Sequence, residues 1–360
     1  MIKLFYPANH FYDECLSDLQ PVLSGRWWGQ AGQVQEFERL FAEEYAYPFC
    51  IALNSGTAAL EIAYDLIGIT EGDEVITPVL TCTATNIPLA RRKANIIFAD
   101  VGREDLTVSI RDIEQKLTKK TKAVVVVTLG GLPVSEEIFD LCKSHNVPVV
   151  VDAAQSLGTI ESHGDYICYS FQAIKHFTTG DGGMLVVRDS GDYERGKKLR
   201  WFGIDREKKI DSDWQPYRNR EMTIEIEEAG YKFHMNDIAA TLGIVGLRHS
   251  DELLKTRQKI AKHYREHLIK GVHVAGGSFW LYGMLINDRD ERAEELLAAG
   301  IDVNMVHLRN DKYKVFGGRA LDLRNMNYVE EKYLYIPINA HLRDDEVDTV
   351  AREFNRIVAD

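Results

Sequence analysis

The chain has 360 residues, of which 45% are hydrophobic and 27% are charged, and 43 basic against 55 acidic residues give a net charge of −12. This composition is typical of a globular protein with chain enough for about two domains. The negative charge argues against a general nucleic-acid binder, and no apolar run reaches the roughly 20 residues that span a bilayer.

Strand-like and helix-like segments alternate over the first two thirds of the chain. Apolar, β-branched runs occur at 95–99, 123–127, 147–151 and 184–187, with helix-like stretches at 57–67, 111–117 and 134–144. Apolar runs without polar alternation are typical of strands buried on both faces. The order strand–helix–strand implies right-handed crossovers and a mostly parallel sheet. We therefore predict one large α/β domain over residues 1–240.

The pattern changes after about residue 240. Helical periodicity continues over 236–270, and shorter apolar runs and helix-like stretches follow at 279–286, 290–299, 333–337 and 344–358. This mixture predicts a second, smaller α+β domain over residues 241–360.

An acidic residue ends the predicted strand 147–151. Asp152 stands at the carboxyl end of that strand, where open α/β sheets bind their ligands. A buried carboxylate is costly unless it meets a cation or hydrogen-bond donors. Taken alone, a helix cap at a strand-to-helix turn explains Asp152 equally well.

A lysine follows the next short strand, in the segment YSFQAIKHFTTGDGGML. The predicted strand ends at Ser170 and Phe171, Lys175 lies in the turn that follows, and three glycines precede the next strand. A lysine desolvated in such a turn has a lowered pKa and becomes nucleophilic enough to form a Schiff base. A lone lysine is ordinarily a solvated surface cation, but the glycines and the upstream Asp152 favour the reactive lysine here.

Small residues lead into the predicted helix 57–67, in the segment NSGTAALEIAY. Free backbone N–H groups at a helix start favour an anion, although a simple N-cap explains the turn equally well. An anion site, a buried carboxylate and an imine-forming lysine together are what pyridoxal phosphate requires, for its phosphate, its ring nitrogen and its aldehyde.

The motifs resemble those of the sugar aminotransferases of the DegT/DnrJ/StrS type, within the fold type I pyridoxal-phosphate enzymes. The similarity covers nearly the whole chain, from VLSGRWWGQ through LNSGTAALEIA, VDAAQSLG and YSFQAIKHF to YIPINAHLRDD. The order of the motifs and the interval between DAAQ and the lysine make the resemblance specific.

The resemblance implies a role for each matching residue. Lys175 would hold the cofactor and shuttle the substrate proton, Asp152 would pair with the pyridine nitrogen, and Gln155 would lie near the ring hydroxyl. The other cofactor contacts that it implies are Gly56, Thr57, Ala58, Cys82, Ser170 and Lys232. Candidate substrate contacts are Trp28, Arg200 and His307, with packing for Trp28 and a surface salt bridge for Arg200 as the alternatives. No metal ligand is expected.

Three departures from the family pattern stand out. Cys82 occupies the position of an aromatic residue that usually stacks on the cofactor, and Lys232 and His234 replace the Asn and Arg of a GYNxR motif. The loop 128–132, TLGGL, lacks the His and aromatic residue of many members, which affects the expected substrate pocket.

The resemblance implies an aminotransferase that uses L-glutamate, forming 2-oxoglutarate, to aminate a nucleotide-linked keto-sugar for surface polysaccharide or natural-product synthesis. Pyridoxal phosphate would alternate with pyridoxamine phosphate, and a homodimer would share its active sites through GYKFHMND. One alternative is a pyridoxamine-phosphate-dependent sugar dehydratase, whose branch of the family has histidine at the position of Lys175. A non-catalytic regulatory relative is the other, and the intact cofactor motifs argue against it.

The cysteines and the amino terminus bear on the compartment. The five cysteines are scattered and form no CxxC pair, so neither a disulfide framework nor a cysteine-built zinc site is expected. The first residues show no charged-then-apolar leader with a cleavage site, so we expect a cytoplasmic protein.

Overall fold

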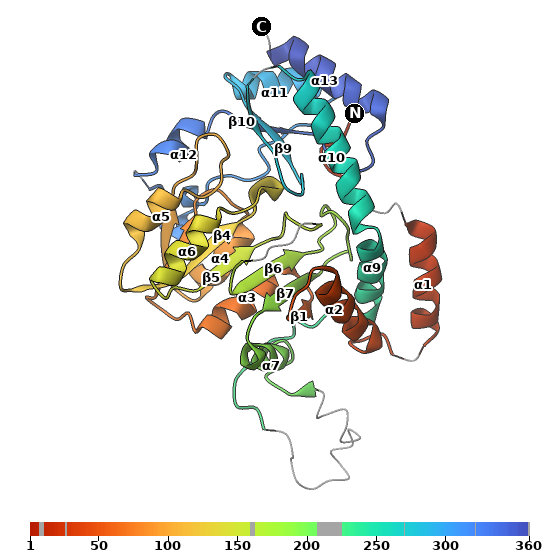
Figure 1. The fold of residues 1–360 in the computed structure, drawn as a ribbon, viewed down its shortest axis with the longest axis vertical. Helices are drawn as coiled ribbons and strands as arrows, with labels where there is room; N and C mark the ends of the chain where they lie inside the picture. The colour runs from red at the N-terminus through yellow and green to blue at the C-terminus, as the bar shows by residue number, and fades with distance from the viewer. Residues whose placement is uncertain are drawn as a thin grey trace.

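A large and a small β-sheet, each covered by helices, form the two parts of the chain (Figure 1). The computed structural model describes residues 1–6, 11–25, 27–158, 163–206, 225–269, 271–320 and 322–358. The two helices α9 (Asp237–Arg248) and α10 (Ser250–His267) connect the two parts. The predicted domain boundary at residue 240 falls inside α9.

The large sheet has seven strands in the order β1-β7-β6-β5-β4-β2-β3. The strands are β1 (Phe49–Leu53), β2 (Glu74–Pro78), β3 (Asn95–Ala99), β4 (Thr121–Val127), β5 (Val149–Asp152), β6 (Tyr166–Ser170) and β7 (Gly183–Val187). Strand β7 runs antiparallel to both of its neighbours, and the other neighbouring pairs are parallel. The predicted α/β fold with a mostly parallel sheet is confirmed.

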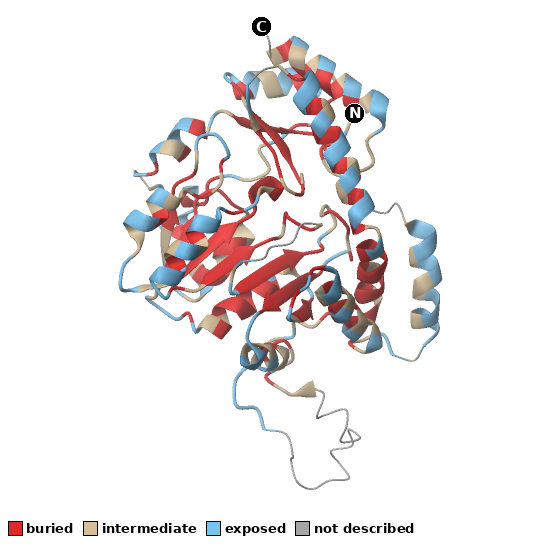
Figure 2. Ribbon diagram, viewed as in Figure 1, coloured by how far each residue is buried: buried red, intermediate tan, exposed pale blue. Residues whose placement is uncertain are grey.

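Alternating side chains of the central strands enter two separate cores. Val124 and Val126 of β4 pack with helices α2 (Gly32–Glu44), α5 (Ile110–Lys116), α6 (Glu136–Ser144) and α9 on one face. Val125 packs with α3 (Gly56–Ile67), α4 (Thr83–Arg91) and α7 (Ser190–Leu199) on the other. Burial on both faces (Figure 2) explains why these strands are uninterrupted apolar runs.

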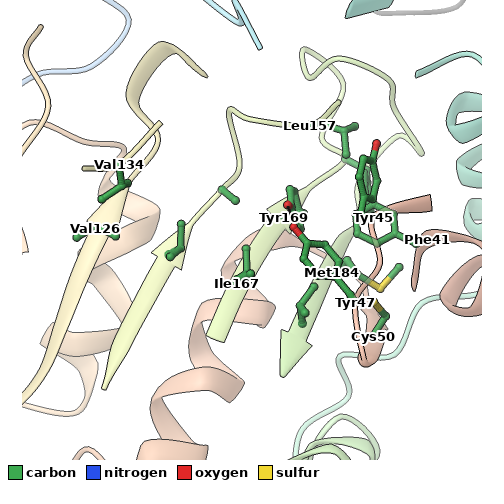
Figure 3. Packing of buried hydrophobic residues seen from close by; sticks show 14 of the residues in the cluster. Phe41, Tyr45, Tyr47, Cys50, Val126, Val134, Leu157, Ile167, Tyr169 and Met184 are labelled. Atoms are coloured by element: carbon green, nitrogen blue, oxygen red, sulfur yellow. Dashed lines mark hydrogen bonds between the residues drawn. The ribbon is translucent and has the colours of Figure 1, made fainter. Parts of the chain in front are cut away.

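An aromatic group closes the first core near α2. Phe41 and Tyr169 lie with ring centroids 5.2 Å apart, and the hydroxyls of Tyr47 and Tyr169 are 2.5 Å apart (Figure 3). This contact gives each of the two buried phenol hydroxyls a hydrogen-bond partner. The exposed helix α1 (Tyr12–Ser24) packs beyond it on α9.

The small part contains an antiparallel sheet in the order β10-β9-β8. Its elements are β8 (Val272–Val274), β9 (Tyr282–Leu285), β10 (Tyr333–Ile336), α11 (Arg289–Ala298), α12 (Arg324–Val329) and α13 (Asp344–Val358). Tyr264 of α10 and Phe354 of α13 are fully buried in its core. The amino terminus joins this part as well, because Ile2 forms a parallel bridge with Ile301. Residues 1–240 therefore do not all pack within the large part.

The described residues contain neither a membrane-spanning helix nor a cluster of metal ligands. Within those residues, no helix combines the length and apolarity needed to cross a membrane. Nor do three or more His, Cys, Asp or Glu side chains of the described segments form a group that could hold a metal ion.

Candidate active site

The candidate site lies at the carboxyl edge of the large sheet. Asp152 ends β5, and Ser170 ends the neighbouring parallel strand β6. Helix α3 begins beside them, because Gly56 packs directly against Ser170. Parallel strands thus bring together segments that are far apart in the sequence, at the edge where such sheets bind ligands.

Asp152 is buried, and each of its carboxylate oxygens has a donor. The hydroxyl of Thr85 in α4 donates to Oδ2 at 2.7 Å, and the backbone N–H of Ala154 donates to Oδ1 at 3.2 Å. Burial raises the pKa of Asp152, while these two hydrogen bonds and the charge of Lys175 oppose that rise. The two hydrogen bonds therefore hold the carboxylate in one orientation. A helix cap alone would not need the bond from Thr85.

Lys175 is desolvated in the turn that follows β6. Its backbone N–H donates to the carbonyl of Gln172 at 2.9 Å, which closes the turn. Burial lowers the pKa of Lys175 to about 8, and attraction to Asp152 and Cys82 partly opposes this shift. The amine of Lys175 therefore loses its proton at a lower pH than a solvated lysine does, as favours a nucleophile or a proton carrier.

The start of α3 forms a cradle that only glycine permits. The Ser55 hydroxyl caps the helix by accepting a hydrogen bond from the N–H of Ala58 at 3.0 Å. A Cβ atom at Gly56 would lie 2.8 Å from the Cβ of Ser170. The N–H groups of this first turn lack intrahelical acceptors. The N-cap is therefore Ser55, and it satisfies the N–H of Ala58.

These features fit pyridoxal phosphate. A cradle that a Cβ would fill lies beside the Ser170 hydroxyl, a buried carboxylate is held by two donors, and Lys175 has a lowered pKa within electrostatic reach of that carboxylate. The three groups correspond to the cofactor's phosphate, ring nitrogen and aldehyde.

Gln155 and His307 meet across the site, from the large and the small part of the chain. Gln155 Oε1 accepts a hydrogen bond from the N–H of Gly130 at 2.7 Å, so its amide nitrogen is the atom 3.0 Å from His307 Nε2. Burial and the charge of Lys175 lower the pKa of His307 to about 3. His307 is therefore neutral at physiological pH, with Nε2 as the acceptor.

Cys82 stands at the rim of a hollow next to the site. The residue precedes α4 and acts on Lys175 electrostatically. Together with His307, Met305 and Tyr313, it lines a cavity of about 370 Å³. Cys82 and His307, which both interact electrostatically with Lys175, therefore share the wall of one cavity.

Three predicted contacts lie elsewhere in the chain. Lys232 Nζ is 4.1 Å from the centroid of the Trp201 ring, and the Trp28 side chain is exposed, donating from Nε1 to the carbonyl of Leu23. Arg200 is 4% exposed and pairs with Glu38, whose carboxylate also accepts from the N–H of Ala52. Arg200 thus forms a buried ion pair with Glu38. From the sequence we considered a substrate contact and a surface salt bridge for Arg200, and neither describes this pair.

The loop 128–132 lies between the large and the small part of the chain. Its residues Gly130 and Gly131 are buried, and their carbonyls accept hydrogen bonds from the N–H groups of Leu281 at 3.0 Å and Ser278 at 3.2 Å. The loop is therefore a junction between the large and small parts.

Two residues that contact the site were missed in the sequence. Thr85 holds Asp152, and Trp280 lies against Lys175. Thr81 and Thr85, spaced one helical turn apart with hydroxyls 2.8 Å apart, offered a weak signal. Trp280 offered none, because its approach to Lys175 depends on how the small part packs.

Comparisons with known proteins identify the family of the chain. The model of the DegT/DnrJ/EryC1/StrS aminotransferase family matches residues 10–355. GDP-perosamine synthase of Escherichia coli O157:H7 is 32% identical, covering 79% of this chain and 77% of that protein. The dTDP-4-dehydro-2,3,6-trideoxy-D-glucose 4-aminotransferase of Saccharopolyspora spinosa is 29% identical over 99% and 97% of the two chains. The crystal structure of sugar aminotransferase CalS13 from Micromonospora echinospora superimposes with a TM-score of 0.88, at 28% identity over 99% and 100% of the chains.

Proposed function

Because the chain belongs to the DegT/DnrJ/EryC1/StrS aminotransferase family, we propose that it transfers the amino group of L-glutamate to a nucleotide-linked keto-sugar. Family membership itself makes the chain a pyridoxal-phosphate-dependent sugar aminotransferase. The observation that carries the catalytic assignment is the desolvated Lys175 beside the buried Asp152, at the sheet edge where ligands bind.

Each residue has a proposed task. When bound, pyridoxal phosphate supplies an aldehyde that condenses with amines and a ring that accepts electrons when a C–H bond breaks. The first turn of α3, Gly56–Ala58, and the Ser170 hydroxyl would hold the phosphate, and Asp152 would keep the ring nitrogen protonated. Lys175 would take the proton from the α-carbon of the donor in the first half-reaction and would deliver a proton to the carbon of the acceptor that receives the amine in the second, as its lowered pKa permits.

The proposed acceptor follows from the relatives and from the cavity. Two relatives are named for a GDP-linked sugar and for a dTDP-linked dehydro-sugar. The hollow between Cys82 and Tyr313 is bordered by the neutral His307, which offers a hydrogen-bond donor through Nδ1 to a sugar hydroxyl. The hollow therefore supports a sugar site bordered by Cys82 and His307.

Dimerisation and location belong to the same proposal. Lys232 and the exposed Trp28 lie outside the Asp152–Lys175 group of their own chain. We propose that they serve the site of the neighbouring subunit in a homodimer, with Lys232 reaching toward the cofactor phosphate.

The five free cysteines fit a cytoplasmic location.

The dehydratase alternative receives no support from the neighbouring histidine. His176 is buried, and its Nε2 donates to the carbonyl of Ser278 at 3.1 Å. Its ring is thus held toward the small part and does not replace the Lys175 amine.

Product analysis tests the proposed reaction. The purified protein with pyridoxal phosphate and L-glutamate would be incubated with GDP- and dTDP-linked 4-keto-sugars, and the products analysed by mass spectrometry. We expect an amino-sugar and an equal amount of 2-oxoglutarate, and neither from the Lys175→Ala variant. Loss of a hydroxyl from the sugar without amine incorporation would instead establish the dehydratase.

A further inference from the structure

The small part of the chain places one aromatic side chain directly against Lys175. Trp280, which precedes β9, is 2% exposed, and Lys175 Nζ lies 4.0 Å from the centroid of its ring. The indole Nε1 donates to the carbonyl of Ile174, the residue before Lys175, at 3.1 Å. One side chain therefore contacts both the reactive amine and the backbone of the turn that carries it.

The indole is itself held from several directions. The rings of Phe5 and His307 stack on it at centroid distances of 5.3 and 6.2 Å. The preceding residue, Phe279, has φ = 51°, a left-handed conformation that a bulky residue adopts only when its surroundings enforce it. Such strain is typical of positions that a functional site requires.

The loop that carries Trp280 is clamped to the large part through Ser278. The Ser278 hydroxyl donates to the carbonyl of Gln155 at 2.7 Å, and its N–H donates to the carbonyl of Gly131 at 3.2 Å. Its carbonyl accepts from His176, the residue after Lys175, at 3.1 Å. The loop 278–281 therefore contacts both residues that flank Lys175 in the sequence.

We propose that Trp280 is the positioning residue of Lys175: its ring face holds the amine in its charged form, and its N–H fixes the turn. This inference rests on the proposed function, in which Lys175 is the cofactor-binding and proton-carrying group. It adds that the small part of the chain sets the position and the protonation of that amine.

Two separable effects follow from this arrangement. An aromatic face stabilises a cation, most strongly for Trp, so the ring favours the ammonium form against the burial that disfavours it. The other titratable groups that act on Lys175 are Asp152, Cys82, His176 and His307, none of which a substitution of Trp280 removes. Losing the ring lowers the pH at which Lys175 gives up its proton, and losing the indole N–H loosens the turn.

The test measures covalent capture of pyridoxal phosphate by cofactor-free, full-length protein over a pH series. Borohydride traps the adduct, and mass spectrometry quantifies the label on Lys175. The midpoint of the rate against pH reports the protonation of the amine, and the plateau at high pH reports its placement. Wild type is compared with Trp280→Tyr, Trp280→Phe and Trp280→Leu.

We expect the midpoint pH to be highest for wild type and to decrease through Trp280→Tyr and Trp280→Phe to Trp280→Leu. The difference between wild type and Trp280→Leu should be about half to one pH unit. The plateau should fall about 10-fold in all three variants, which lack the indole N–H. Phe98→Leu is the matched control, because Phe98 lies in the same core cluster without contacting Lys175. Its midpoint and plateau should equal those of wild type.

The possible results separate the role of Trp280 from the proposed function. A folded Trp280→Leu variant with the wild-type midpoint and plateau would overturn the role of Trp280 and leave the proposed function standing. If the Leu variant does not fold, the order of midpoints among Trp, Tyr and Phe decides the same question, and equal midpoints and plateaus would overturn the role. Absence of label on Lys175 of wild type at every pH would overturn the proposed function as well.

Discussion

Burial and nearby charges shift the pKa of the Lys175 amine in opposite directions. Asp152 makes the largest contribution in favour of the charged form. Burial lowers the pKa of Lys175 to about 8, and Asp152 limits that shift. The amide of Asn keeps the shape of the Asp152 side chain but removes its charge, and its NH2 group cannot accept the hydrogen bond that one carboxylate oxygen now accepts.

Asp152→Asn should reduce turnover on the order of 100-fold, because an amide cannot keep the ring nitrogen protonated. The variant should also release pyridoxal phosphate more readily, and its cofactor-free form should capture pyridoxal phosphate down to lower pH, because the pKa of the free Lys175 amine falls. Release of 2-oxoglutarate measures turnover, and borohydride trapping of the cofactor at several pH values measures the shift. Asp189→Asn, which alters the N-cap of α7 away from the site, is the control and should retain activity.

His307 makes the stability of the protein depend on pH. In the unfolded chain its imidazole takes up a proton near pH 6.5, whereas in the folded chain burial and Lys175 hold the pKa at about 3. Between these values the unfolded state binds more protons, so the free energy of unfolding falls as the pH falls from about 6.5 toward 3. The buried His176 acts in the same direction.

His307→Gln should therefore lose less stability than wild type on acidification from pH 7 to pH 5. Urea unfolding at the two pH values measures the difference, and an identical loss in both proteins would contradict the assigned protonation state. His267→Gln, at the exposed end of α10, serves as the control and should behave like wild type.

Among the helices and strands, the buried pair of Arg200 and Glu38 joins three elements. Arg200 follows α7, Glu38 lies in α2, and both contact Ala52 of β1. Removing one charge of a buried pair leaves the other without its partner, which is strongly destabilising. The pair therefore has a structural role, because it ties α2 and the end of α7 to β1.

Arg200→Met should lower the free energy of unfolding by about 3 to 5 kcal/mol. The exposed pair Arg195–Glu228 supplies the control, since Arg195→Met should cost less than about 1 kcal/mol. Denaturant unfolding measures both. KM for the sugar nucleotide should be unchanged in the folded Arg200→Met protein, and a large rise in KM with unchanged stability would restore Arg200 as a substrate contact.

At the scale of the whole molecule, the two parts meet where Gly131 faces the loop before β9. Gly131 has φ = 97°, and a Cβ there would lie 2.9 Å from the backbone nitrogen of Phe279, beside the Ser278 hydroxyl. Gly300, at φ = 84°, has no atom within 4 Å of an added Cβ. Both glycines have a positive φ, but only at Gly131 does another segment of the backbone lie close to the position of an added Cβ.

Gly131→Ala should therefore destabilise the protein by about 1 to 3 kcal/mol more than Gly300→Ala. Because the displaced loop carries Trp280, the Gly131 variant should also release pyridoxal phosphate faster after dilution. Thermal unfolding and cofactor fluorescence measure the two effects. Equal behaviour of the two variants would show that the junction tolerates movement.

How much of this could be predicted differs between the sheet and the junction. The segments 95–99, 123–127 and 184–187 are apolar without alternation because both faces of the sheet are covered, so their sequences reveal the strands. Asp152 and Lys175 were predicted because local motifs place them at strand ends. The burial of Arg200, the reversal of β7 and the contact of Trp280 with Lys175 were not, because each depends on packing between segments distant in sequence.

The most direct test of the central claim is one absorbance titration. The purified protein is loaded with pyridoxal phosphate, freed of unbound cofactor, and titrated with L-glutamate, with Lys175→Ala treated in parallel. We predict a protein-bound band in the visible range that gives way to near-ultraviolet absorbance as 2-oxoglutarate forms, and neither change in the variant. A wild-type protein that retains no cofactor band, or a Lys175→Ala variant that responds to glutamate as wild type does, would contradict the assignment of Lys175.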